Sequence, residues 1–423
     1  MPQKTRTSSL GSGQVALVLG SAVFAYFVSV IQRSTMGVAA LSASDRFETG
    51  ATALSSLAAA QLAMYALMQI PAGIALDSFG ARRLIIFGSI LTGMGNLVVA
   101  AAEQLPWAVL GRMVVGFGDA FVFISMIRLI NGWVSGPKAT RYTQLFANLG
   151  QLGQLVSAIP FAFILGIAGW SVSFSAAASL ALIAAALGFL FLRDEPLSNG
   201  QLNALSNAGK QFRENIADPF TRKAFWVHFT MQSSGSVFIL LWGYTFLVEA
   251  EGLSKAFASV LLGSFVFIGF LVGPILSHLC VRHPANRHRL VLAVFGLMTV
   301  AWLLIIFSPG VNPLWQILLL VLSIGVGGPA SMIAFDYSRN SIPAFRLGSS
   351  NGIINSGGFV ATFITMFLVG LALDLIQRYG LSGGAPLYSL ASFKLAFPIQ
   401  VAVMTVGIAM FLRERRLTRR VQE

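Results

Sequence analysis

The chain alternates between long apolar runs and short polar breaks along almost its whole length. Each run is about 20 residues long, which is enough for a helix to cross roughly 30 Å of hydrocarbon. A helix satisfies its own backbone hydrogen bonds, so it can lie in lipid without a partner strand. Strand-like alternation of apolar and polar residues is absent, which argues against an outer-membrane barrel. We therefore predict an all-α membrane protein.

The runs predict twelve spans in two sets of six. The first set lies at about residues 14–39, 54–76, 84–102, 107–133, 142–167 and 171–192, and the second at about 223–248, 256–280, 289–308, 313–337, 347–376 and 393–412. Between the sets lies the one long hydrophilic stretch, which begins RDEPLSNGQ. We predict an N-terminal six-helix bundle over residues 1–192, a cytoplasmic linker over 193–222, and a C-terminal six-helix bundle with a basic tail over 223–423.

The composition agrees with a protein dissolved in lipid. Of the 423 residues, 56% are hydrophobic and only 10% are charged, and the mean hydropathy is +0.77, whereas a soluble domain needs far more charge to cover its surface. The net charge of +13 does not indicate nucleic acid, because 21 of the 28 Lys and Arg residues fall on the side of the N-terminus and only four on the other. This positive-inside bias predicts a multi-pass protein of the inner (plasma) membrane, surrounded by lipid, with both termini in the cytoplasm.

A charged stretch, GIALDSFGARRLI at residues 73–85, interrupts the apolar pattern between the second and third spans. Gly73 allows a close approach of helices, and Gly80 permits a tight turn. Asp77 can reach a helix N-terminus or an arginine. Arg82 and Arg83 hold the loop at the cytoplasmic surface.

This stretch resembles the signature loop of the major facilitator superfamily, with Ser78 and Ala81 in place of two usual basic residues. Arg112, Gly116 and Gly118 in the fourth span resemble a second motif of that family. The second half of the chain repeats the first weakly at an offset of 200 residues, which places GPILSHLCVRH on GIALDSFGARR. The resemblance implies two pseudo-symmetric six-helix bundles that rock around a central cavity.

The resemblance also implies a gate at the cytoplasmic face that is made and broken as the bundles rock. We assign to this gate the charged stretch and the charged residues near the ends of spans 4 and 10: Gly73, Asp77, Gly80, Arg82, Arg83, Arg128, Asp336 and Arg339. Asp336 and Arg339 lie three residues apart, which permits an ion pair within one helix. The alternative for Arg128 is a side chain that reaches toward the membrane surface.

Charged residues inside the spans are the first candidates for function, because a charge near the bilayer centre costs at least ~3 kcal/mol unless it has a partner or faces water. Arg112 and Asp119 lie seven residues apart in the fourth span, on one face of the helix. We predict that Arg112 binds an anionic group of a substrate and that Asp119 carries a coupling proton. The alternative is a buried ion network of Arg33, Arg112 and Asp119 that serves packing alone. Arg33 itself either attracts anions near the outer mouth or pairs with an acid.

Uncharged polar residues at helical spacing mark three further spans. Gln151, Gln232 and Asn355 lie about ten residues from the cytoplasmic ends of their spans, near the midplane, where transporters bind substrate. We predict that these three, together with Tyr26 and Arg33, contact the substrate, although single residues of this kind more often form interhelical hydrogen bonds. His228 is a second candidate for proton coupling, because histidine titrates near neutral pH, or else a packing residue near the surface.

The sequence offers little support for an enzyme. It holds no nucleophile elbow, no Gly-x-x-x-x-Gly-Lys loop and no His-Glu-x-x-His pair, and the lone Cys280 can form no intrachain disulfide. We therefore predict no catalytic residue, no metal and no cofactor. The predicted function is that of a monomeric secondary transporter that imports a small organic or inorganic anion with protons by alternating access. The alternatives are a proton-driven exporter of amphipathic drugs and a non-transporting receptor with the same fold.

Overall fold

The computed structural model describes residues 12–134, 137–194, 209, 212–339 and 341–422, and within these ranges every regular element is a helix. Eleven helical stretches are long and apolar enough to cross a membrane. One of them, Asn148–Phe191, contains Gly169 with a φ of 76°, outside the helical region. That stretch therefore holds two of the predicted spans. All twelve predicted spans are helical, and the all-α prediction is confirmed.

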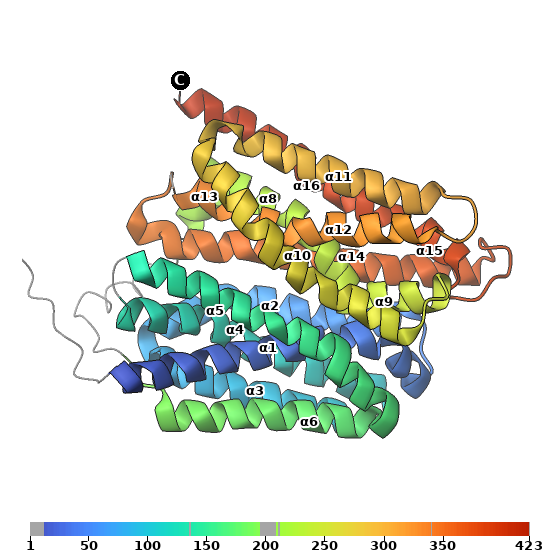
Figure 1. Cartoon of the computed structure of the whole chain (residues 1–423), viewed down its shortest axis with the longest axis horizontal. Coiled ribbons are helices and arrows are strands. Elements are labelled where there is room, and N and C mark those ends of the chain that lie inside the picture. The colour runs from blue at the N-terminus through green and yellow to red at the C-terminus, as the bar shows by residue number, and fades with distance from the viewer. Residues whose placement is uncertain (1–11, 135–136, 195–208, 210–211, 340, 423) are drawn as a thin grey trace, which may run out of the picture.

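The N-terminal helices occupy the lower half of the view in Figure 1. They are α1 (Ser12–Phe47), α2 (Ala51–Phe79), α3 (Ala81–Ala101), α4 (Leu105–Trp133), α5 (Pro137–Val156), the π-helical η1 (Ser157–Phe161) and α6 (Ala162–Phe191). Helices α3 and α4 approach so closely that a Cβ at Gly95 would come within 2.7 Å of the backbone oxygen of Gly111. Small residues permit such contacts in lipid, where van der Waals packing drives the association of helices.

The C-terminal helices occupy the upper half of the same view (Figure 1). They are α8 (Pro219–Val237), η2 (Phe238–Trp242), α9 (Gly243–Thr245), η3 (Phe246–Ala250), α10 (Lys255–Arg282), η4 (Pro284–Asn286), α11 (Arg287–Phe307), α12 (Leu314–Ser331), α13 (Ile333–Arg339), α14 (Ala344–Arg378), α15 (Leu390–Ala396) and α16 (Pro398–Gln422). Asp218 caps α8, because its carboxylate accepts hydrogen bonds from the backbone nitrogens of Phe220 at 2.8 Å and Thr221 at 3.1 Å.

The two groups of helices meet chiefly along α2 and α14, which pack side by side in opposite directions. We call this contact the α2–α14 seam, and it runs from Ala51 beside Asp374 to Gln69 beside Asn355. Helix α1 begins and α16 ends at one end of the molecule (Figure 1). We call the other end, where α1 leads into α2, the α1–α2 end. The predicted linker lies largely outside the described residues, and the predicted domain boundaries stay predictions.

Candidate functional site

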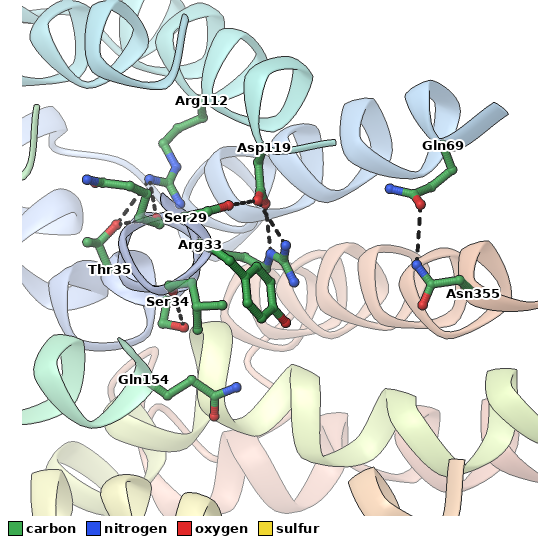
Figure 2. A network of polar contacts seen from close by, with 12 residues as sticks. Ser29, Arg33, Ser34, Thr35, Gln69, Arg112, Asp119, Gln154 and Asn355 are labelled. Atoms are coloured by element: carbon green, nitrogen blue, oxygen red, sulfur yellow. Dashed lines mark hydrogen bonds and ion pairs between the residues drawn. The ribbon is translucent and has the colours of Figure 1, made fainter. Parts of the chain in front are cut away.

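Asp119 lies at the middle of α4, fourteen residues from each end of that helix. Its carboxylate accepts two hydrogen bonds from Arg33 on α1, from Nε at 2.8 Å and from Nη2 at 2.9 Å. Ser29, one turn before Arg33, donates a third hydrogen bond to the same carboxylate. The side chains of Arg33 and Asp119 are 11% and 1% exposed, so each charge depends on the other for its stability in this medium. Figure 2 shows the pair reaching from α1 to α4.

Two aromatic rings, one from each half of the molecule, lie over the guanidinium of Arg33. The ring of Tyr65 on α2 is centred 4.5 Å from Cζ of Arg33, and the ring of Phe359 on α14 is centred 5.4 Å from it. The centres of the two rings lie 4.6 Å apart. We call this pair of rings the ring clamp. Cation–π attraction adds to the ion pair, so Arg33 is held at the point where the two halves meet.

Arg112 is fully buried and has a different environment from Arg33. Its Nη1 donates to the backbone oxygen of Gln32 at 3.3 Å and to Oγ1 of Thr35 at 3.1 Å. Thr35 follows Arg33 by two residues, about 200° around the helix, so Arg112 meets α1 on a side away from Arg33 (Figure 2). Within the described residues, no ion pair joins Arg112 to Asp119, so the ion network of three residues predicted as the alternative contains only Arg33 and Asp119. The role of Arg112 in anion binding stays a prediction.

The other predicted site residues of the N-terminal half lie together. Gln151 on α5 donates to the hydroxyl oxygen of Tyr26 on α1 at 3.0 Å, and Gln154 donates to the side-chain oxygen of Gln151. Tyr26 is buried, whereas Gln151 is half-buried. These contacts form a polar surface on α1 and α5 in which hydroxyl and amide groups are both present.

The predicted site residues of the C-terminal half also have polar partners. The amide of Gln232 on α8 donates to Ser236 at 3.0 Å and accepts from Ser331 on α12 at 3.1 Å. Nδ1 of His228 accepts from the backbone nitrogen of Gly358 at 3.1 Å. This contact assigns the ring proton of a neutral imidazole to Nε2.

Asn355 on α14 connects the two halves. Its Nδ2 donates to Oε1 of Gln69 on α2 at 3.4 Å (Figure 2). Both residues lie four positions, about one helical turn, from the rings of the clamp. The structure therefore gives each uncharged candidate a hydrogen-bond partner. The role of each in substrate binding stays a prediction.

The tight turn predicted at Gly80 is confirmed, whereas the gate itself stays a prediction. Gly80 joins α2 to α3 with a φ of 80°, and a Cβ there would come within 2.6 Å of Oδ2 of Asp194. Oδ1 of Asp194 accepts from the backbone nitrogen of Arg82 at 2.8 Å, and the Arg82 guanidinium donates to the backbone oxygen of Phe189 at 2.9 Å. The loop is thus fastened to the end of α6, while Arg83 is exposed.

One expectation about the gate is wrong. Among the described residues, a Cβ at Gly73 would meet nothing within 4 Å, so close packing on that side of α2 is not the reason for this glycine, although the adjacent Ala72 is buried. Arg128 and Asp336 are half-buried. The side chains of Asp77 and Arg339 lie outside the described residues. The roles of these residues in a gate stay predictions.

Sequence reasoning missed several residues of this site. Ser29 lies four residues before Arg33 and so on the same face of α1, a spacing that could have identified it. Phe359 is one of 34 phenylalanines, and nothing in the sequence distinguishes it. Gln69 and Ser331 come from helices whose neighbours only the folded chain defines.

Comparisons with known proteins place this architecture. The family model of the Major Facilitator Superfamily matches residues 22–366. The chain is 23% identical to a hexuronate transporter of Bacillus subtilis, with 88% of this chain and 92% of that protein covered. It is 25% identical to a probable sulfoacetate transporter of Cupriavidus necator, with 92% and 91% covered.

The fold also matches a solved structure. A bacterial homologue of the human lysosomal transporter Spinster, in an inward-facing and unoccupied conformation, superimposes with a TM-score of 0.74 at 16% identity. The match covers 96% of this chain and 98% of that one. With its twelve helical spans in two sets, the chain belongs to the major facilitator superfamily and is a multi-pass membrane transporter of small solutes rather than an enzyme.

Proposed function

We propose that this transporter carries a small organic anion together with a proton, and that Arg33 binds the anion while Asp119 binds the proton. The observation that carries the proposal is the ion pair of these two residues in the middle of α4, with 2.8 Å between Arg33 Nε and Asp119 Oδ2. An intramembrane ionisable pair of this kind is costly to maintain unless it serves function.

The chemistry of the pair links the two cargoes. While Asp119 is ionised, its carboxylate occupies two donors of Arg33, and an anionic substrate must compete for them. A proton on Asp119 removes that negative charge, so the guanidinium becomes available to a carboxylate or sulfonate of the substrate. Proton and anion then bind cooperatively, because each stabilises the state that the other requires. After release of both, the pair reforms and neutralises the empty site for the return step.

The uncharged candidates supply hydrogen bonds around this charged centre. Tyr26 and Gln151 face it from the N-terminal half, and Gln232 and Asn355 from the C-terminal half, in our assignment. The relatives named as hexuronate and probable sulfoacetate transporters support the anionic class of the cargo. The predicted role of His228 as a second proton carrier stays a prediction.

The membrane arrangement belongs to the same proposal. We place both termini in the cytoplasm, which puts the α1–α2 end on the outer side of the plasma membrane, because most Lys and Arg residues fall on the side of the termini. The two bundles, joined by the linker at 193–222, expose the site to either side in turn as a monomer.

The test uses purified full-length protein in liposomes with an inward proton gradient and labelled glucuronate and sulfoacetate. We expect uphill uptake that collapses with a protonophore. Asp119→Asn removes proton-driven uptake but keeps exchange of bound substrate across the membrane, because the neutral amide mimics the protonated acid. Asp45→Asn is the matched control, because Asp45 is exposed. We expect uptake by this variant to be unchanged. Full uphill uptake by Asp119→Asn would remove this residue from the mechanism.

Two other outcomes identify the alternatives. Flux of lipophilic cations without flux of anions supports a drug exporter, and binding without flux of any solute supports a receptor. Arg33→Gln distinguishes the drug exporter further, because only a protein that binds an anion loses ligand affinity with that change.

A further inference from the structure

The α2–α14 seam is fastened at the α1–α2 end by a carboxylate that crosses from one half of the molecule to the other. Oδ1 of Asp374, near the end of α14, accepts from the backbone nitrogen of Ala51 at 2.8 Å, and Oδ2 accepts from that of Thr52 at 2.9 Å. These two nitrogens belong to the first turn of α2. An acidic side chain at that position satisfies otherwise unpaired donors and interacts favourably with the helix dipole.

The sequence around Ala51 is built to receive this carboxylate. The residue that precedes α2 is Gly50, which offers no side-chain cap of its own. A Cβ at Gly50 would come within 2.6 Å of Oδ1 of Asp374. One turn earlier on α14, a Cβ at Gly370 would come within 2.6 Å of the side-chain oxygen of Ser55. Two glycines therefore allow α14 to reach α2, and Asp374 takes the capping place that Ser, Thr or Asp at position 50 would otherwise fill.

The same seam carries the ring clamp. The two helices run antiparallel from the contact of Asp374 with Ala51 to the contact of Phe359 with Tyr65. The ring of Tyr65 lies over the guanidinium of Arg33. One ring belongs to each half of the molecule, so the clamp is complete only while α2 and α14 are in register. If the α1–α2 end of the seam separates, the rings part and the guanidinium of Arg33 loses part of its enclosure.

We propose that Asp374 is a positioning residue that locks the α1–α2 end of the seam and thereby keeps the ring clamp closed over Arg33. The lock must break whenever that end of the molecule opens. At the opposite end of the antiparallel pair, position 77 falls at the level of the first turn of α14, in the register set by Gln69 and Asn355. Asp374 thus has on α14, at the α1–α2 end, a position that corresponds to that of Asp77 on α2 at the opposite end. The inference rests on the proposed function only for alternating access and needs no particular substrate.

The first test measures conformation and requires no transport. Cys280, the one cysteine of the chain, is replaced by alanine, and spin labels are placed on the exposed positions Glu48 and Tyr379 at the α1–α2 end. We expect Asp374→Ala to raise the ratio of molecules with widely separated labels to molecules with close labels about two- to thirty-fold, the range that loss of a helix cap produces. Asp374→Asn keeps one acceptor and shifts the ratio less. Asp45→Asn, an exposed acid at the same end, leaves the ratio unchanged.

The second test reads the clamp directly. Phenylglyoxal modifies accessible arginines, and mass spectrometry reports the rate at each position. We expect Arg33 to react several-fold faster in Asp374→Ala, whereas exposed Arg378 reacts at the same rate in both proteins. Unchanged distances in Asp374→Ala and Asp374→Asn overturn the lock, and changed distances with an unchanged Arg33 rate overturn its link to the clamp. The proposed function fails separately, by the absence of anion flux in the wild-type protein.

Discussion

The two halves of this transporter carry different polar chemistry near the middle of the membrane. The N-terminal half contributes charge, with Arg33 paired to Asp119 and Arg112 held against α1. The C-terminal half contributes amide and hydroxyl groups, among them Gln232 and Ser331. The pseudo-symmetry of the fold therefore does not extend to its chemistry. In the proposed function, the N-terminal half binds the charge of the substrate and moves the proton, while the C-terminal half distinguishes the uncharged parts of the substrate.

The largest effect is expected when charge is removed from the N-terminal half. Arg33→Gln leaves Asp119 buried without a cation, and we expect a loss of about 3–5 kcal/mol in the free energy of unfolding. The double variant Arg33→Gln with Asp119→Asn recovers most of that loss, because neither residue is then an unpaired charge. Thermal and denaturant unfolding of the purified proteins measure the cycle. Strictly additive losses would show that the pair is not coupled in the folded state.

A smaller effect is expected from the neutral half. Gln232→Ala removes an amide with two hydrogen-bonding partners, so we expect the affinity for hydroxylated glucuronate to fall about tenfold, which corresponds to roughly 1.4 kcal/mol. The affinity for propionate, which has no hydroxyl group, stays the same. Competition against labelled glucuronate gives both values, with exposed Gln377→Ala as control. An equal loss for both acids would place Gln232 in charge recognition and weaken the contrast between the halves.

The smallest effect concerns charge at the boundary of the C-terminal half. Glu251 lies between η3 and α10, where its carboxylate accepts from the backbone nitrogen of Asn312 at 3.1 Å and from Nδ2 at 2.5 Å. Burial raises the pKa of Glu251 above its ordinary value of 4.5. The folded state therefore binds the proton more tightly than the unfolded state does, and stability falls as pH rises from about 4.5 through the raised pKa.

Glu251→Gln tests this assignment. The glutamine keeps an acceptor for Asn312 but does not titrate, so we expect the decline of unfolding temperature over that pH range to flatten. Anion uptake at neutral pH stays unchanged, because Glu251 lies outside the membrane-spanning helices. A variant with the same pH profile as wild type would assign the decline to other groups.

Much of the fold could be predicted because lipid imposes a strict rule on the backbone. Apolar runs of about 20 residues have to be helices, so the order of spans followed from the sequence, although helices such as α14 continue past the hydrocarbon to a length of 35 residues. Asp119 was identifiable because few charges occur inside the spans. The sequence could not predict that Asp119 pairs with Arg33 rather than with Arg112, because helical spacing describes one helix and does not identify the neighbouring helix that faces it.

Other parts of the site left weaker signals in the sequence. Asp374 lies near the end of a span, where an acid is typical of a membrane surface, and its role depends on the first turn of a distant helix. Phe359 contributes only through its position beside Tyr65 and Arg33, which its residue type does not reveal. Gly73 fitted a packing role by its residue type, and only the open space where its Cβ would lie shows that this role is wrong.

The break at Gly169 has a practical consequence for mapping how the protein sits in the membrane. A single residue with a φ of 76° separates the fifth and sixth spans, and Trp170 directly after it is anchored by its Nε1, which donates to the backbone oxygen of Val99 at 2.8 Å. No loop exists there to accept an epitope tag, a reporter enzyme or a protease site. Fusions designed from hydropathy alone would disrupt two helices at this point.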